Sequence, residues 1–202
     1  MDASLLYHEG NRRLQDRFGS RGIADRLEAT TLRRAFSESD ARFIEEAEVF
    51  FLATADAFGR PDCSCEGGPP GFVRVIGPAE LAFPDFGGDG MFKSLGNILT
   101  NPAVGMLFLA TGPRPAGLRV NGTARVSLDD PLIGVFAGAR LVTRVRARAI
   151  FPTCPRPLPG PEGASARAPR SGMAPVEPAW TRFDAVGEAG PPRAPATGEG
   201  RR

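Results

Sequence analysis

Two segments in the second half of the chain alternate apolar and polar residues along their whole length. In LRVNGTARV (118–126), residues at even positions are apolar or small, and those at odd positions are polar or charged. In LVTRVRARAIF (141–151), one face is expected to carry Leu141, Val145, Ala147, Ala149 and Phe151, opposite a ladder of Arg144, Arg146 and Arg148. Such period-two patterning predicts antiparallel strands with one buried and one wet face. We interpret the arginines as a solvated face rather than a binding stripe, because exposed strand faces are commonly charged.

Further strands are predicted earlier in the chain. VFFLATA (49–55) and AVGMLFLA (103–110) are apolar throughout, as fully buried strands are. Glycine and proline turns separate three shorter candidates: CSCEG (63–67), GFVRVIG (71–77) and ELAFPDF (80–86). Short helices are expected at about 91–100 and at 129–136. Six or seven strands with tight turns and one internal helix indicate a small closed antiparallel barrel.

The two ends of the chain differ from this central part. Residues 3–18, 23–36 and 37–48 have helix-compatible spacing of apolar residues, and Ser37 and Ser39 are N-cap candidates for the third helix. Beyond Arg156 the sequence is rich in Pro, Gly and Ala, a composition typical of disorder. Residues 177–186, which contain Trp180 and Phe183, are the exception. From the sequence, docking of this segment on the barrel and no docking are equal alternatives. The expected organisation is a helical extension (1–48), a barrel domain (49–156) and a largely disordered tail (157–202).

Composition excludes several classes of function. The net charge of +2 comes from mixed charges with no basic stripe, so a nucleic-acid partner is not expected. No run approaches the roughly 18 apolar residues of a membrane helix, and the N-terminus lacks the features of a secretion signal. We therefore expect a cytoplasmic protein with no membrane partner.

Catalytic side chains are scarce as well. The chain has one histidine, His8, and three cysteines without a C-x-x-C pair, so neither a zinc site nor Ser-His or Cys-His catalysis is expected. Cys63 and Cys65 are interpreted as strand cysteines rather than metal ligands. No catalytic residue can be named, and any demanding chemistry would come from a bound cofactor.

Lys93 is the only lysine of the chain, and it lies in the first turn of the helix expected after the glycine-rich stretch FGGDG (86–90). Glycines allow close approach of the backbone to an anion, and a helix N-terminus adds partial positive charge. Lys93 and Ser94 would supply a full charge and a hydroxyl, so the pattern describes a phosphate cradle. It lacks the register of a P-loop. From the residues alone, a phosphate site and an ordinary surface helix remain equal alternatives.

A family resemblance favours the phosphate site. The segments FFLATADAFGRPDCS, GFVRV, LAFPDFGGDGMFKSLGNILTNPAVGMLF, LRVNGTARV and AIFPTCPR, in this order, resemble the pyridoxamine 5'-phosphate oxidase superfamily of FMN-binding split barrels. The N-terminal YHEGNRRLQDRFGSRGIADRL is similar to that of a bacterial branch of FMN-dependent enzymes in this superfamily. The resemblance covers roughly residues 7–156. It implies a mainly β, six-stranded antiparallel split barrel that forms a homodimer with two FMN molecules at the subunit interface.

The resemblance also implies site residues. Residues expected to hold the FMN phosphate are Arg74, Lys93, Ser94 and Asn97. The isoalloxazine would lie along the strand that contains Asp62, Cys63 and Ser64, mainly against its backbone. Contacts from the partner subunit would come from Arg119, Asn121 and the stretch Cys154, Pro155 and Arg156.

Two departures from the superfamily bear on the reaction. The C-terminal basic segment that grips the substrate phosphate in true pyridoxamine-phosphate oxidases cannot be placed, and Gly117 stands where many members have a glutamine that faces the flavin. The resemblance therefore implies an FMN-dependent oxidoreductase that acts on an unidentified small molecule, with vitamin B6 oxidation in doubt. The alternatives are a non-catalytic flavin-binding or flavin-sensing protein, and a relative that uses deazaflavin F420 or haem. Haem is disfavoured because only His8 offers an imidazole.

Overall fold

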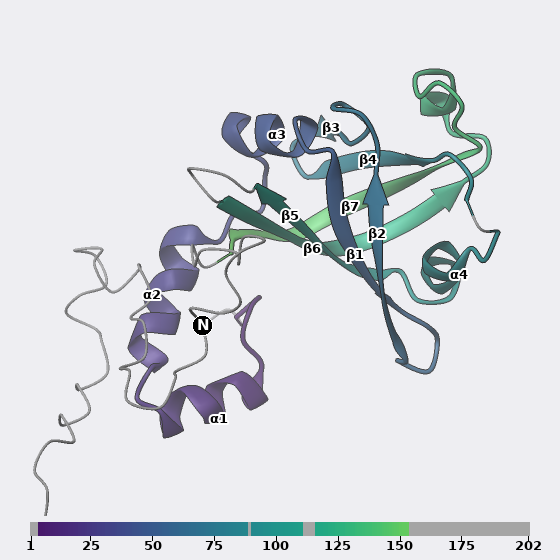
Figure 1. The fold of residues 1–202 in the computed structure, drawn as a ribbon. Helices are drawn as coiled ribbons and strands as arrows, with labels where there is room; N and C mark the ends of the chain where they lie inside the picture. The colour runs from purple at the N-terminus through teal and green to yellow at the C-terminus, as the bar shows by residue number, and fades with distance from the viewer. Residues whose placement is uncertain (1–3, 89, 111–115, 154–202) are drawn as a thin grey trace, which may run out of the picture.

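The computed structural model describes residues 4–88, 90–110 and 116–153 (Figure 1). Its helices are α1 (Glu9–Arg17), α2 (Arg21–Thr31), α3 (Glu38–Glu45), α4 (Lys93–Thr100) and the single-turn η1 (Pro131–Gly134). Its strands are β1 (Val49–Ala55), β2 (Pro61–Gly67), β3 (Arg74–Gly77), β4 (Glu80–Asp85), β5 (Ala103–Ala110), β6 (Ala116–Ser127) and β7 (Leu141–Pro152). Each predicted strand and helix is present, with bounds that differ by a few residues.

The seven strands form one antiparallel sheet in the order β2-β1-β5-β6-β7-β4-β3. The sheet curls on itself, because the rings of Phe50 on β1 and Phe83 on β4 meet at 5.1 Å although three strands separate them in the order. In the described part of the chain no ladder joins β2 to β3, so these two strands are the edges of the sheet. The barrel is therefore split, which confirms the mainly β split-barrel prediction, although the sheet has seven strands where the resemblance implied six.

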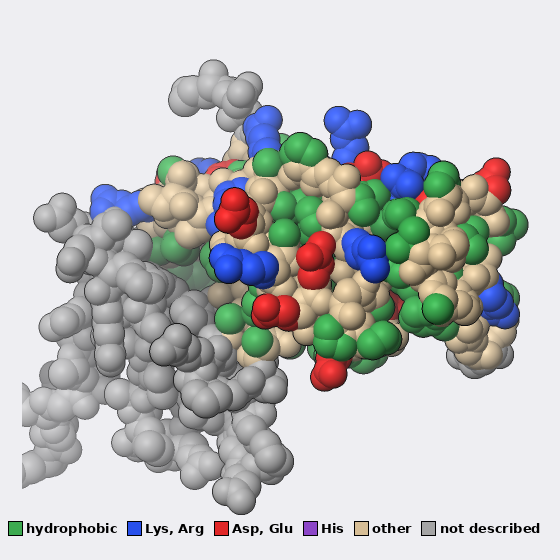
Figure 2. Space-filling model, turned by 90° about the horizontal axis from the view of Figure 1, so that it is seen from above, with side chains coloured by type: hydrophobic (Ala, Val, Ile, Leu, Met, Phe, Trp, Pro, Cys, Tyr) green, Lys and Arg blue, Asp and Glu red, His purple; other side chains and the backbone are tan. Residues whose placement is uncertain are grey.

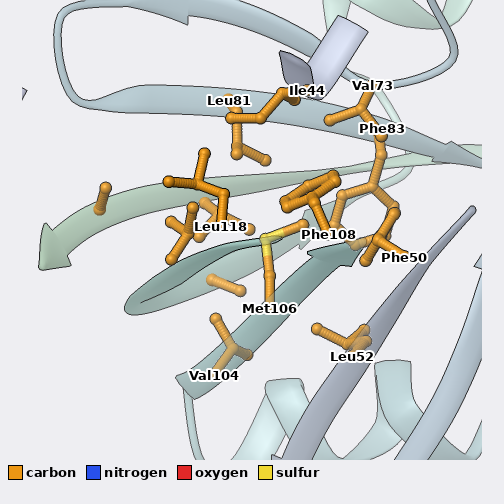
Figure 3. Packing of buried hydrophobic residues seen from close by; sticks show 14 of the residues in the cluster. Ile44, Phe50, Leu52, Val73, Leu81, Phe83, Val104, Met106, Phe108 and Leu118 are labelled. Atoms are coloured by element: carbon orange, nitrogen blue, oxygen red, sulfur yellow. The ribbon is translucent and has the colours of Figure 1, made fainter. Parts of the chain in front are cut away.

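The main core fills the inside of this curl. Phe50 contacts Phe108 at 5.1 Å and Phe72 at 5.8 Å between ring centroids, and Figure 3 shows the rings of Phe50, Phe83 and Phe108 together. The largest fully buried apolar side chains of this core come from α3, from five of the strands and from the residue before β3: Ile44, Phe50, Leu52, Val73, Leu81, Met106, Phe108, Val120, Val145 and Ile150. Burying one such side chain contributes roughly 1.5–3 kcal/mol, so these contacts dominate the stability of the barrel.

A bulge interrupts the pairing of β6 and β7. Asn121 pairs with Ala149 but the next residue, Gly122, pairs with Ala147, so Arg148 is an extra residue on β7. The strands approach closely there, since a Cβ on Gly122 would lie 2.1 Å from a backbone oxygen of β7. A bulge of this kind shifts the alternation of the strand by one residue.

The bulge corrects one sequence expectation. Ile150 pairs with Val120 and is fully buried in the main core, whereas Phe151 pairs with the exposed Arg119 on the other face. Phe151 was expected on the core face with Val145, and this expectation was wrong. The arginine that follows Ala147 belongs to an unbroken alternation in the sequence, so nothing local revealed the extra residue.

The arginine ladder is only partly a solvated face. Arg146 and Arg148 are exposed, as expected. Arg144 instead donates hydrogen bonds of 2.6 and 3.0 Å to the buried carboxylate of Asp130, which also caps η1 through the N–H of Leu132. The hydrogen bond from Arg144 holds the pKa of Asp130 below its ordinary value. Figure 2 shows acidic and basic side chains interspersed with apolar ones on the face seen from above.

In addition to Ile44 of α3, which lies in the main core, Arg33 links the N-terminal helices to the barrel. Its backbone N–H and C=O exchange hydrogen bonds of 2.8 and 2.9 Å with Ile150, beyond the point where β4 stops pairing with β7. Its side chain donates to both oxygens of Asp40 at 2.7 and 2.9 Å. Asp40 also closes a capping box with Ser37, which confirms Ser37 as an N-cap. One arginine thus fixes α2 and α3 to the sheet.

Some expectations fall outside the described residues. These are the disordered tail (157–202), the docking segment with Trp180 and Phe183, and the stretch Cys154, Pro155 and Arg156. Among the described helices, none is long and apolar enough to cross a membrane.

Replacing Asp40 with asparagine should lower the free energy of unfolding by about 1.5–3 kcal/mol at neutral pH, the typical worth of hydrogen bonds to a charged group. Burial opposes ionisation of Asp40, but hydrogen bonds from Arg33 and Ser37 outweigh it and hold the pKa of this carboxyl below its ordinary value. The stabilisation should therefore be complete above pH about 4 and should disappear as pH falls through the lower folded pKa. Urea unfolding of both proteins against pH measures this difference. Glu38→Gln, an exposed change on the same helix, is the control, and an equal loss in that variant would contradict the assignment.

Candidate functional site

Helix α4 lies against β1 and β2 at one end of the barrel (Figure 1). Its sequence KSLGNILT buries Ser94, Asn97 and Ile98 against the sheet, whereas Lys93 and Leu99 are exposed. Two of the three buried residues are polar. Because buried polar groups need hydrogen-bond partners, this face of α4 must meet polar groups on the sheet.

The first polar contact joins α4 to β1 through Asn97. Its amide nitrogen donates to the hydroxyl of Thr54 at 2.9 Å, and both residues are buried. Its amide oxygen accepts a hydrogen bond from the ammonium of Lys93 at 3.3 Å. Lys93 is therefore folded back along its own helix, with its charge held beside Asn97.

The second polar contact joins α4 to the edge strand β2. The hydroxyl of Ser94 lies 2.9 Å from that of Ser64 and 3.5 Å from a carboxylate oxygen of Asp62. Ser64 donates to Glu66 at 2.6 Å. Since side chains alternate along a strand, Asp62, Ser64 and Glu66 share the face toward α4, and Cys63 lies on the opposite face. The hydroxyl of Ser94 is thus directed into the protein, toward β2.

The loop before α4 has an unusual backbone. Phe92, the N-cap residue, has φ 49° and is the one non-glycine residue with positive φ in the described part of the chain. It provides no side-chain hydrogen bond to the helix. Among the described residues, no side chain therefore caps the first N–H groups of α4, at the end of the helix that carries partial positive charge.

Arg140 holds this loop in place. Its side chain donates to Asp85 at 3.1 and 3.3 Å, its own N–H donates to the carbonyl of Asp85 at 2.8 Å, and its guanidinium lies 5.2 Å from the ring centroid of Phe92. Gly87 has φ 83° and passes so close that a Cβ there would lie 2.8 Å from the guanidinium carbon. Sequence reasoning missed Arg140, because it comes from the segment before β7 and has no local signal.

Arg74 lies at the start of β3 on the surface. Its Nε donates to the carbonyl of Gly71 at 3.4 Å, and its guanidinium stacks 5.6 Å from the ring centroid of the buried Phe136. Arg74 pairs with Ala82, three residues before the end of β4, which leads into the loop of Phe92. Arg74 and the start of that loop therefore lie toward the same end of β4, about 10 Å apart along the strand.

Other predicted site residues lie on the opposite, outward face of the sheet. Across the strands, Cys63 pairs with Ala53, Ala53 with Gly105, and Gly105 with Asn121. Arg119 is exposed on the same face, beside Leu107. The structure thus brings Asp62, Ser64, Lys93, Ser94 and Asn97 together and separates Cys63, Arg119 and Asn121 from them.

Packing accounts for the glycine at position 117. A Cβ on Gly117 would lie 2.1 Å from a methyl carbon of Thr153 and 3.0 Å from Leu109, so a larger side chain would have to displace Thr153. Gly117 therefore contributes backbone alone at this position.

The arrangement is suited to binding an anion. The start of α4 and the ammonium of Lys93 supply positive charge at one end of the barrel, and the stacked guanidinium of Arg74 supplies a further charge on the surface at the start of β3. The face of β2 toward α4 carries carboxylates bonded to serines, and no trio of His, Cys, Asp or Glu within the described ranges is arranged as a metal site. A phosphate monoester such as that of FMN fits this donor set.

Replacing Asn97 with alanine should lower the free energy of unfolding by about 1–3 kcal/mol, because the buried hydroxyl of Thr54 loses its partner. Chemical denaturation with fluorescence or circular dichroism measures the loss. Leu99→Ala on the same helix is the matched control, since Leu99 is 72 % exposed and its truncation should be nearly neutral. Equal stability of both variants would show that the amide does not tether α4.

Comparison with known proteins gives a family and several similar folds. The model of the pyridoxamine 5'-phosphate oxidase family matches residues 36–173. No curated protein matches the chain. Among solved structures, HupZ of Group A Streptococcus is 19 % identical with a TM-score of 0.47, covering 65 % of this chain and 98 % of its own. An FMN-binding protein of Syntrophomonas wolfei is 15 % identical with a TM-score of 0.43, covering 70 % and 95 %. HutZ, a haem storage protein of Vibrio cholerae, is 18 % identical with a TM-score of 0.39, covering 54 % and 88 %.

The family match spans more than half of the chain and includes the whole barrel from β1 to β7. The protein belongs to the pyridoxamine 5'-phosphate oxidase family.

Proposed function

We propose that this protein binds FMN, with the phosphate at the start of α4. The observation that carries the proposal is the helix N-terminus without a side-chain cap, which the left-handed Phe92 leaves open beside Lys93. Membership of the pyridoxamine 5'-phosphate oxidase family supports a flavin phosphate as the anion. Backbone N–H groups and a lysine together suit a phosphate, because charge-assisted hydrogen bonds to it are strong.

Each predicted phosphate residue has its own part in this proposal. Lys93 leaves the amide oxygen of Asn97, to which it is bonded at 3.3 Å, and turns to the phosphate. Arg74 supplies a second cation whose plane is already fixed by stacking on Phe136. Ser94 and Asn97 hold α4 against β2 and β1, so that its N–H groups keep a constant direction.

The flavin ring is proposed to lie along β2. As an edge strand, β2 pairs only with β1 in the described sheet, which leaves the outward-pointing backbone groups of alternate residues in the stretch Asp62, Cys63 and Ser64 available to a ring. Arg119 and Asn121 face outward on β6, so they would serve the site of a partner subunit. We therefore propose a homodimer with FMN at the interface, built from residues 49–156 of each chain with residues 1–48 as an extension.

The reaction proposed is an FMN-dependent oxidation or reduction of a small organic molecule. Bound FMN supplies hydride and electron transfer, and the chain binds it, orients its ring and excludes water. Within the described part of the site, the carboxylates of Asp62 and Glu66 are hydrogen-bonded to serine hydroxyls, and neither is assigned as an acid or base. For that reason non-catalytic flavin binding remains the second candidate.

The absorption spectrum and the ligand released on heating would also identify haem or F420 as the cofactor. His8 uses Nδ1 to accept a hydrogen bond of 3.0 Å from the N–H of Gly10, where it caps α1 away from the sheet. This position does not favour haem ligation at the proposed site.

Purified protein should bind FMN with an oxidised-flavin absorption spectrum, and should bind it at least tenfold more tightly than riboflavin, which lacks the phosphate. Fluorescence titration of the apoprotein with each ligand measures the ratio. Equal affinities would remove the phosphate site from the proposal. A Soret band, or release of a deazaflavin on heating, would identify haem or F420 instead. Turnover with candidate reductants separates an enzyme from a flavin-binding protein.

Replacing Lys93 with alanine should weaken FMN binding by about ten- to more than a hundredfold, since a charge-assisted hydrogen bond is worth roughly 1.5–3 kcal/mol. Riboflavin affinity should stay unchanged, because the ring and ribityl chain keep their contacts. Lys93→Arg should retain part of the FMN affinity, as charge survives with a different geometry. Arg146→Ala, which removes an exposed cation on the wet face of β7, is the matched control. Wild-type FMN affinity in Lys93→Ala would show that this lysine does not contact the phosphate.

A further inference from the structure

Helix α1 exposes a stripe that combines apolar and basic residues. Leu14 and Phe18 are 60 % and 69 % exposed, and they lie one helical turn apart. Arg13 and Arg17 are exposed beside them at the same spacing, and neither forms an ion pair within the described residues. These four residues are called the arm stripe. None of the nine residues of α1 is buried in the described part of the chain.

The hairpin of α1 and α2 is nevertheless firmly built. Arg12 contacts Asp25 at 2.6 Å and Glu28 at 3.8 Å across the two helices, and Arg21 pairs with Asp16. Glu28 also accepts hydrogen bonds from the hydroxyl of Ser4 and from the N–H groups of Leu5 and Leu6. Such a network fixes the direction of α1, so the exposed stripe is a constant feature of the surface rather than a frayed end.

A complementary surface lies at the start of β1. Val49 and Phe51 are 38 % and 39 % exposed on the outward face of the sheet. Glu46 and Glu48, just before them, are exposed, and their carboxylates have no ion-pair partner within the described ranges. These four residues are called the sheet patch. It matches the arm stripe, with two large apolar side chains beside two unpaired charges of opposite sign.

The two surfaces do not meet in one chain. Figure 1 shows α1 at the far end of α2 from α3, whereas β1 begins directly after α3. The bridge between Arg33 and Ile150 and the pair of Arg33 with Asp40 fix α2 and α3 to the barrel between them. The arm stripe and the sheet patch of one chain therefore can contact a complementary surface only on another molecule.

We propose that the arm stripe of one chain docks on the sheet patch of a second copy, and that the exchange is reciprocal about a two-fold axis. Each dimer then contains two identical contacts, and both apolar pairs are covered. The occupant is a second copy because the same chain carries both halves of the charge pattern, and opposite charges select the partner and its orientation. This inference rests on the homodimer proposed above and names the surfaces that form it.

Charge reversal gives a direct test. An arm variant, Arg13→Glu with Arg17→Glu, places like charges at both contacts of its homodimer, and so does a patch variant, Glu46→Arg with Glu48→Arg. In sedimentation at low salt, each variant alone should show a dimer Kd raised at least tenfold. An equimolar mixture should recover the wild-type Kd, because in the heterodimer both contacts regain opposite charges. Arg34→Glu with Arg146→Glu, at two exposed arginines elsewhere, makes the same change in net charge as the arm variant and should leave the Kd unchanged.

Every other result overturns the inference. If both variants dimerise like wild type, another surface of the chain or another occupant covers the stripe and the patch. If only the combination of all four changes in one chain restores the dimer, while mixing does not, the two surfaces meet within one chain. If the wild-type protein is itself a monomer at micromolar concentration, the proposed homodimer fails as well, whereas the FMN titration still tests the flavin site separately.

Discussion

The barrel depends on the contact of aromatic rings around Phe50. This one side chain on β1 meets Phe83 from β4 and Phe108 from β5, so it draws opposite parts of a seven-stranded sheet over a common core. Once β1 is fixed with Phe50 inward, its alternate residue Phe51 must face outward. The same constraint therefore produces both the packed interior and the exposed apolar face that we assign to a second copy.

The candidate site lies where the curled sheet ends, at the edge strand β2 and helix α4. Strand β2 pairs with β1 alone. Helix α4 packs against both strands through hydrogen bonds of Asn97 and Ser94 rather than through a purely apolar face. Polar tethers specify one orientation, because a buried amide or hydroxyl has few satisfactory partners. Arg140 and the left-handed Phe92 then set the direction of the first turn. The orientation of the first turn of α4 therefore depends on contacts with several parts of the barrel, and not on the sequence of the helix alone.

Much of the architecture could be predicted from the sequence, because local periodicity carries it. The apolar runs, the period-two segments and the glycine and proline turns between shorter candidates located every strand, and Ser37 marked the start of α3. Phe151 shows the limit of this reasoning. The bulge at Arg148 is imposed by the partner strand, which comes within van der Waals reach at Gly122, and no alternation within β7 records it. The grouping of Lys93, Ser94 and Asn97 was predictable because they share one helix.

By itself the sequence determined the secondary structure and the family, since both depend on residues that act over short separations or in a constant order. Only the tertiary structure decided which candidate residues share a site. It directs Ser94 toward Ser64, and it turns Arg119 to the opposite face of the sheet. It also introduced Arg140, whose contact with Asp85 joins positions 55 residues apart in the chain. These outcomes depend on strand register and on the curl of the sheet, which arise from contacts distant in sequence.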